Sequence, residues 1–88
     1  MDRPVRRGRI EIISSILTAA KDGVIKTRLM YQSNLDFRGL DKYLDFLVSK
    51  KFLERSDSGK TMYKTTQKGL EFLQTYGKLE DSLYEKEG

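Results

Sequence analysis

The chain has 88 residues, which is enough for one domain, and a domain of this size buries only about 60% of its unfolded surface. Hydrophobic residues make up 38% of the chain and charged residues 34%, as in soluble globular proteins. Cysteine and histidine are absent, which excludes disulfides and thiolate metal sites and removes the usual proton shuttle. Neither an activated nucleophile nor a Gly-rich phosphate motif is evident. We therefore expect no enzymatic activity, no cofactor and no metal.

Charge is distributed unevenly along the chain. Residues 1–70 hold 15 Lys/Arg against 8 Asp/Glu, whereas residues 71–88 hold 2 against 5. A basic body of this kind is typical of proteins that bind polyanions such as nucleic acids. No stretch approaches the roughly 20 apolar residues that span a membrane, and the basic N-terminus lacks the apolar segment of a signal peptide. We therefore expect a cytoplasmic protein without a membrane partner.

The first part of the chain predicts a basic arm and a helix. Residues 1–8 carry three arginines without apolar periodicity, so we expect a flexible arm. Between Arg9 and Lys21 the apolar residues recur at the spacing of one face of an amphipathic helix. Asp22-Gly23 is expected to end this helix. Val24-Ile25 is too short for more than one bridge of a strand.

Two further helices are predicted next. Thr27 offers an N-cap hydroxyl to a short helix over Thr27–Gln32, and Ser33–Leu35 is typical of a turn. A strong apolar stripe then predicts a third helix over Asp36–Lys50, with Asp36 as its N-cap. A short helix, a turn and a longer helix in this order are typical of a helix-turn-helix.

A hairpin and a last helix complete the chain. The strand-like runs 52–55 and 62–65 flank turn-forming residues and predict a two-stranded hairpin. Because an isolated hairpin is marginal in water, it must pack on the helices. Thr66 can cap a last helix that continues to the acidic end. The order predicts an α+β, mainly helical winged helix-turn-helix domain over residues 9–69, followed by a C-terminal helix over residues 70–88.

Four segments of the chain resemble one known family. They are Lys26-Thr27-Arg28-Leu29-Met30-Tyr31, Asn34-Leu35, Leu40-Asp41-Lys42-Tyr43-Leu44-Asp45-Phe46-Leu47-Val48 and Tyr63-Lys64-Thr65-Thr66-Gln67-Lys68-Gly69-Leu70-Glu71-Phe72-Leu73. They resemble the archaeal winged helix-turn-helix family, and within it the small 10a-type chromatin-associated DNA-binding proteins, whose long last helix forms a coiled-coil dimer. The resemblance implies an archaeal, nucleoid-associated DNA-binding homodimer. Relatives commonly place glycine at position 51 to end the third helix in the left-handed conformation, so Lys51 would cost up to about 1 kcal/mol there.

The third helix is the candidate for reading DNA bases. In helix-turn-helix proteins the first residues of the second helix meet base edges in the major groove. Those residues are Phe37, Arg38, Gly39, Asp41 and Lys42. Arg38 can donate two parallel hydrogen bonds to guanine, or it can pair instead with Asp41 or Asp45 on its own helix. Because carboxylates repel phosphate, the acidic residues of this helix predict a shallower position in the groove than usual.

Basic residues elsewhere extend the predicted DNA-binding surface. Arg6, Arg7 and Arg9 come from the arm and the first helix, Lys26, Arg28 and Lys68 from helix starts, and Arg55, Lys60 and Lys64 from the hairpin. Such residues contact phosphates, and arginines of an arm can enter the minor groove. The alternatives are a solubilising arm and hairpin lysines that only discourage edge pairing. For the aromatic residues Tyr31, Tyr43 and Phe46, helical spacing favours packing over base stacking.

The last helix predicts a dimer. Phe72, Tyr76, Leu79 and Leu83 follow the spacing of coiled-coil core positions, whereas Leu70 and Leu73 can face the domain. An apolar stripe beyond a small domain has to be buried, and a second copy offers the surface for it. The sequence therefore predicts a homodimeric double-stranded DNA-binding protein, either chromatin-associated or a transcriptional regulator. The alternatives are a protein-interaction module, docking through the acidic third helix and Phe46, and an RNA-binding protein, which the narrow major groove of RNA disfavours.

Overall fold

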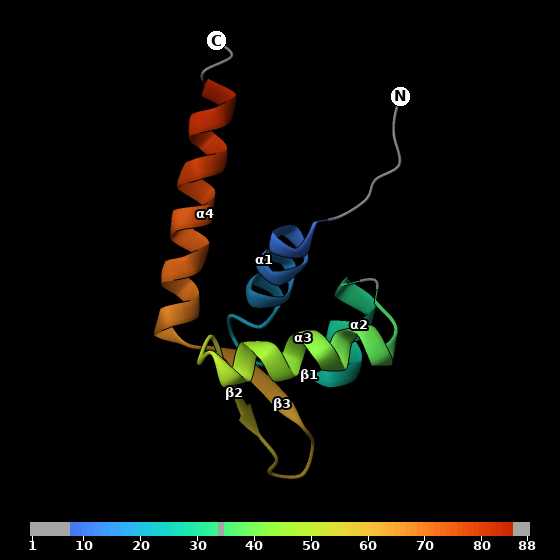
Figure 1. Cartoon of the computed structure of the whole chain (residues 1–88). Helices are drawn as coiled ribbons and strands as arrows, with labels where there is room; N and C mark the ends of the chain where they lie inside the picture. Colours follow the sequence, from blue (N-terminus) through green and yellow to red (C-terminus); the bar gives the residue numbers. More distant parts are fainter. Residues whose placement is uncertain (1–7, 34, 86–88) are drawn as a thin grey trace.

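The computed structural model describes residues 8–33 and 35–85 of the chain, with side chains up to residue 79 (Figure 1). Its elements are α1 (Arg9–Ala19), β1 (Val24–Ile25), α2 (Lys26–Ser33), α3 (Phe37–Ser49), β2 (Leu53–Ser56), β3 (Met62–Thr65) and α4 (Gln67–Glu85). The predicted mainly helical winged helix-turn-helix fold is confirmed. No helix in the described part of the chain is long and apolar enough to cross a membrane.

The sheet has three antiparallel strands in the order β1-β3-β2, not the two that the sequence predicts. Val24 pairs with Tyr63, and Ile25 pairs with Met62. β1 therefore forms two pairs with β3, although the sequence predicts only one. The added pairing has a tertiary cause, because Thr65 N–H donates to the carbonyl of Ala20 over 2.9 Å and draws the start of β1 against β3. β2 and β3 form the predicted wing hairpin.

The core lies where the first three helices meet the sheet. Its largest fully buried side chains come from α1, α2 and α3 and are Ile16, Leu17, Leu29, Leu40, Leu44 and Leu47. The strands add Val24, Leu53 and Tyr63, which are nearly as buried. Burying a side chain of this size contributes about 1.5–3 kcal/mol. The buried face of α3 is the one that its helical periodicity predicts. The same holds for α1 except at Ile10, which belongs to the predicted apolar face but is 48% exposed.

The ends of the first two helices differ from the prediction. α1 ends at Ala19, two residues before Lys21, and Gly23 then turns the chain with a φ of +93°. α2 begins at Lys26, so Thr27 lies inside its first turn and the prediction that Thr27 is the N-cap is wrong. The reason is that β1 runs directly into α2. Ser33 is the last residue of α2 rather than part of a turn, and its hydroxyl donates to the carbonyl of Leu29 over 2.7 Å.

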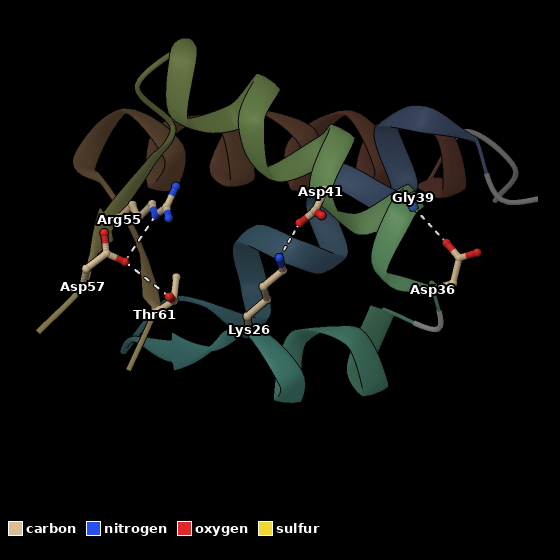
Figure 2. Close-up of polar contacts among 7 residues, drawn as sticks. All are labelled: Lys26, Asp36, Gly39, Asp41, Arg55, Asp57 and Thr61. Carbon is tan, nitrogen blue, oxygen red and sulfur yellow. Dashed lines mark hydrogen bonds and ion pairs between the residues drawn. The ribbon is translucent and has the colours of Figure 1, made fainter. Parts of the chain in front are cut away.

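Both ends of α3 carry defined caps. Asp36 is the predicted N-cap, and its carboxylate accepts from the N–H of Gly39 over 2.8 Å (Figure 2). At the other end, Lys51 has a φ of +68°. Phe52 N–H donates to the carbonyl of Leu47 over 2.9 Å, and Lys51 N–H donates to that of Val48 over 3.0 Å. This pair of hydrogen bonds is the Schellman motif, so the expected left-handed lysine is confirmed.

Replacing that lysine should stabilise the fold. Lys51→Gly is expected to raise the free energy of unfolding by up to about 1 kcal/mol, because glycine adopts a positive φ without a steric penalty from a Cβ atom. Urea denaturation of the variant and the parent chain measures the difference. Lys51→Ala removes the same charge but keeps the Cβ atom, so this control should show no comparable gain. A Lys51→Gly variant no more stable than Lys51→Ala would contradict the explanation.

The joint between α3, β2 and α4 depends on two threonines and a glycine. Thr66 caps α4 as predicted, because its hydroxyl accepts from Gly69 N–H over 3.1 Å, and it donates to the carbonyl of Lys51 over 2.7 Å. The buried hydroxyl of Thr65 donates to the carbonyl of Leu17 over 2.7 Å. A Cβ atom on Gly69 would lie 2.5 Å from the carbonyl oxygen of Phe52. This segment of the sequence therefore connects the helices, the wing and α4.

Candidate nucleic-acid interface

A groove brings together three elements that are separate in the sequence. It has a volume of about 490 Å³ and lies where the starts of α2 and α3 face the loop between β2 and β3. Lys26 and Thr27 line it from α2, Phe37 from α3, and Lys60 and Thr61 from the wing loop. Lys26, Phe37 and Lys60 are predicted site residues. The sequence analysis did not select the two threonines as site residues. Each directly follows one of the groove lysines in the sequence, and this pairing of an ammonium group with a hydroxyl is the signal that could have identified them.

Lys26 is the best-defined cation of the groove. Its Nζ atom forms an ion pair with Oδ1 of Asp41 at 2.5 Å, across the gap between α2 and α3 (Figure 2). The same atom lies 5.5 Å from the centre of the Phe37 ring, within the range of a cation–π interaction. Asp41 therefore does not pair with Arg38, which was one of the alternatives that the sequence left open. Arg38 is exposed and forms no ion pair with any described residue.

The wing loop is held by one carboxylate. Asp57 Oδ1 lies 3.4 Å from Nε of Arg55 and accepts from the hydroxyl of Thr61 over 3.3 Å (Figure 2). Gly59 has a φ of +91°, which permits the turn at the tip. Lys60 stays exposed beside the groove and has no ion-pair partner among the residues described. The wing loop thus leaves Lys60 exposed, whereas Arg55 forms an ion pair with Asp57.

Lys64 and Arg55 do not line the groove. Together with Glu54 and Asp22 they line a depression next to the turn after α1. Glu54 stands opposite Lys64 in the register of β2 and β3. Of the three predicted basic residues of the hairpin, Lys60 is therefore the one that lines the groove at the starts of α2 and α3.

The remaining predicted cations occupy three further places. Lys68 Nζ donates to the carbonyl of Lys50 over 3.0 Å and lies 5.1 Å from the centre of the Phe52 ring, so it caps the C-terminal end of α3. Arg9 and Lys42 line a pocket of about 230 Å³ between α1 and α3, together with Ile13, Tyr43 and Phe46. Arg28 is exposed on α2. Arg6 and Arg7 lie outside the described residues.

The three aromatic residues that were expected to pack behave differently. Tyr43 is half-buried against the core, as expected, and Phe46 is 43% exposed. Tyr31 is 79% exposed, so it does not pack in the core of the protomer. The reason is its position on α2, where Leu29 and Ser33 occupy the buried face. Tyr31 therefore adds an exposed ring and hydroxyl close to Arg28 along the same helix.

The winged helix-turn-helix family matches residues 6–83 of the sequence. The chain belongs to this family. It is 40% identical over 85 residues to the uncharacterized protein MJ0287 of Methanocaldococcus jannaschii, in a match that covers 96% of this chain and 77% of that protein. It is 36% identical over 66 residues to MJ0290 of the same organism, covering 74% of this chain and 30% of that one.

Solved structures of the same fold agree with this membership. Sso10a-2, a DNA-binding protein from Sulfolobus solfataricus, matches with a TM-score of 0.76 and 27% identity, over 92% of this chain and 90% of that one. A mutant of MarR from E. coli, complexed with operator DNA, matches with a TM-score of 0.62 and 27% identity, over 75% and 49% of the two chains. The predicted resemblance to archaeal winged helix-turn-helix proteins of the 10a type is confirmed.

In this winged helix-turn-helix protein, α4 projects from the domain on the side opposite to the wing (Figure 1). Of the four residues predicted to form a dimer interface, Phe72 packs on the domain, with its ring 5.6 Å from that of Phe52. The ring of Tyr76 stacks on Phe72 at 6.4 Å. Leu79 is 61% exposed. The side chain of Leu83 lies outside the described residues.

Proposed function

We propose that the chain binds double-stranded DNA through α3 and the wing, as a homodimer joined by α4, and that it has no catalytic role. The observation that carries the proposal is the groove between the starts of α2 and α3 and the wing loop. Two lysines and two threonines line it beside the exposed ring of Phe37. Ammonium and hydroxyl groups donate hydrogen bonds to phosphate oxygens. The groove therefore suits one strand of a DNA backbone.

Within this proposal the residues divide into two roles. Lys26 and Lys60 contact phosphates and set the register of the protein on the duplex. Arg38 enters the major groove from the first turn of α3, where an exposed guanidinium without an ion-pair partner among the described residues can donate to guanine. Phe37 lines the groove beside the two lysines. Further DNA contacts are proposed for Arg28, Lys42, Arg55, Lys64 and Lys68, and for Arg6, Arg7 and Arg9. Sso10a-2 is a DNA-binding protein, and the MarR chain is complexed with operator DNA, which supports the proposal.

The proposed setting is the cytoplasm, with the protein bound to chromosomal DNA as an architectural protein or as a transcriptional regulator. The second candidate is a protein-interaction module without DNA binding. The pocket between α1 and α3 favours it, because Phe46 is 43% exposed there and Tyr43 lies beside it. The two candidates differ in their response to salt, because only binding to a polyanion releases condensed counterions.

A salt titration tests the proposal. For a duplex of random sequence, log K should fall linearly with log salt at about −0.9 for each phosphate neutralised, and about six contacts per protomer predict a steep slope. Fluorescence anisotropy at several salt concentrations measures it. Lys60→Ala should weaken binding to all sequences and reduce the steepness by about 0.9. Lys78→Ala, an equal charge change on the exposed face of α4, is the control. Two results would contradict DNA binding through the groove. One is an affinity for DNA that does not depend on salt, and the other is an equal loss of affinity in Lys60→Ala and Lys78→Ala.

A further inference from the structure

Lys26, one of the two lysines that line the groove, already forms an ion pair in the protein without DNA. Lys26 Nζ lies 2.5 Å from Oδ1 of Asp41, and the two side chains are 31% and 51% exposed. Lys26 lines the groove from the first position of α2, and Asp41 lies on the helix that is proposed to read bases. The carboxylate of Asp41 is therefore bound to the same ammonium group that a DNA phosphate would bind.

We propose that Asp41 limits the affinity of the protein for DNA, because a DNA phosphate has to displace this carboxylate from Lys26 during binding. The inference rests on the proposed DNA-binding function and identifies Asp41 as a residue that tunes it. The partner group is a phosphodiester. Its oxygens compete with Oδ1 of Asp41 for the same ammonium hydrogens.

The geometry makes this exchange feasible. An ion pair between partly exposed side chains contributes little to stability, so the fold does not depend on it. The contact with Phe37 does not depend on the carboxylate, since the ring centre lies 5.5 Å from Nζ and Phe37 lines the groove. Asp41 remains nearby and repels the bound phosphate. The net effect of Asp41 on DNA affinity is therefore unfavourable.

The other carboxylates close to this surface have different surroundings. Asp36 accepts from Gly39 N–H and caps α3. Asp57 is held by Arg55 and Thr61 in the wing loop. Asp45 lies one helical turn after Asp41 on α3, is exposed, and forms no ion pair with any residue that the structure describes. Asp45 is thus a matched control for removing one negative charge from the same helix.

Asp41→Asn tests the proposal, because it removes the charge and keeps the shape of the side chain. Binding to a random duplex of DNA at moderate salt should become about three- to tenfold tighter. The salt slope should become steeper by up to about 0.9, since Lys26 is then fully available to a phosphate. Asp45→Asn should change affinity less than about twofold, because that carboxylate acts only at a distance. Circular dichroism checks that both variants fold as the parent chain does.

A double-mutant comparison separates the pair from a general charge effect. In a Lys26→Met background, which keeps the apolar stem and removes the ammonium group, Asp41→Asn should give no larger gain than Asp45→Asn. Equal gains from Asp41→Asn and Asp45→Asn in the parent chain would overturn the proposal, as would weaker binding by Asp41→Asn. If the parent chain binds duplex DNA with the expected salt slope and Asp41→Asn changes neither the affinity nor the slope, only the inference about Asp41 fails. If neither the parent chain nor any variant binds DNA, both the proposed function and the inference about Asp41 fail.

Discussion

Gly69→Ala is expected to lower the free energy of unfolding by about 2–3 kcal/mol. The added Cβ atom would lie 2.5 Å from the carbonyl oxygen of Phe52 and 2.6 Å from Cγ2 of Thr65. Neither group can move freely. The Phe52 carbonyl accepts from Thr66 N–H over 3.0 Å, and Thr65 donates its hydroxyl to a buried carbonyl of α1. The substitution therefore forces α4 away from the end of α3 and strains the joint that supports the wing.

Thermal unfolding measures this effect, and a loss of this size should lower Tm by about 10–20 °C in a domain of this length. Gly77→Ala is the matched control, because it lies in the same helix and its added Cβ atom would meet nothing within 4 Å. That variant should gain up to about 1 kcal/mol, since alanine favours a helix over glycine. If both variants are stabilised, the contact between Gly69 and Phe52 is not a constraint on the fold.

The parts of the fold that could be predicted are those that depend on local pattern. The apolar stripes of α1 and α3 and the cap formed by Asp36 follow from neighbours in the sequence. The left-handed conformation of Lys51 was expected from the resemblance to the family, whose members commonly carry glycine there. The third strand and the start of α2 could not be predicted in this way. β1 is held by residues from β3, far along the chain, and a two-residue strand has no periodicity of its own.

The candidate site was predictable in composition but not in arrangement. Lys26, Phe37 and Lys60 were selected separately, and the crossing of α2, α3 and the wing loop brings them to one groove. The pairing of Lys26 with Asp41 joins two helices, whereas the sequence pattern suggested only pairs within α3. Lys68 was selected as a phosphate contact because it lies near a helix start. Its contact with the carbonyl of Lys50 shows that such a lysine can also bind the end of a neighbouring helix.

The proposed dimer gives α4 a role in DNA binding. α4 and the wing extend from opposite sides of the domain (Figure 1), so an interface along α4 leaves the groove of each protomer open. Two grooves at a constant separation can bind one duplex twice or two duplexes at once. In either case the second contact becomes intramolecular and raises the apparent affinity.

Leu79→Glu/Leu83→Glu is expected to convert the proposed dimer into monomers. Leu79 is 61% exposed in the protomer, so the domain does not need it, whereas Phe72 packs on Phe52 and its replacement would disturb the core. If Leu79 faces a second copy, a glutamate there buries an unpaired charge against apolar side chains. The double substitution should then weaken association by more than about 100-fold.

Sedimentation equilibrium at tens of micromolar, followed by DNA titration of the same samples, separates assembly from function. The parent chain should sediment as a dimer and the variant as a folded monomer with lower affinity for duplex DNA. Gln74→Glu adds a charge at an exposed position of the same helix and should leave the dimer intact. A parent chain that sediments as a monomer would contradict the dimer. A monomeric variant with undiminished affinity would contradict only the link between dimerisation and DNA binding, because each groove would then bind its duplex independently.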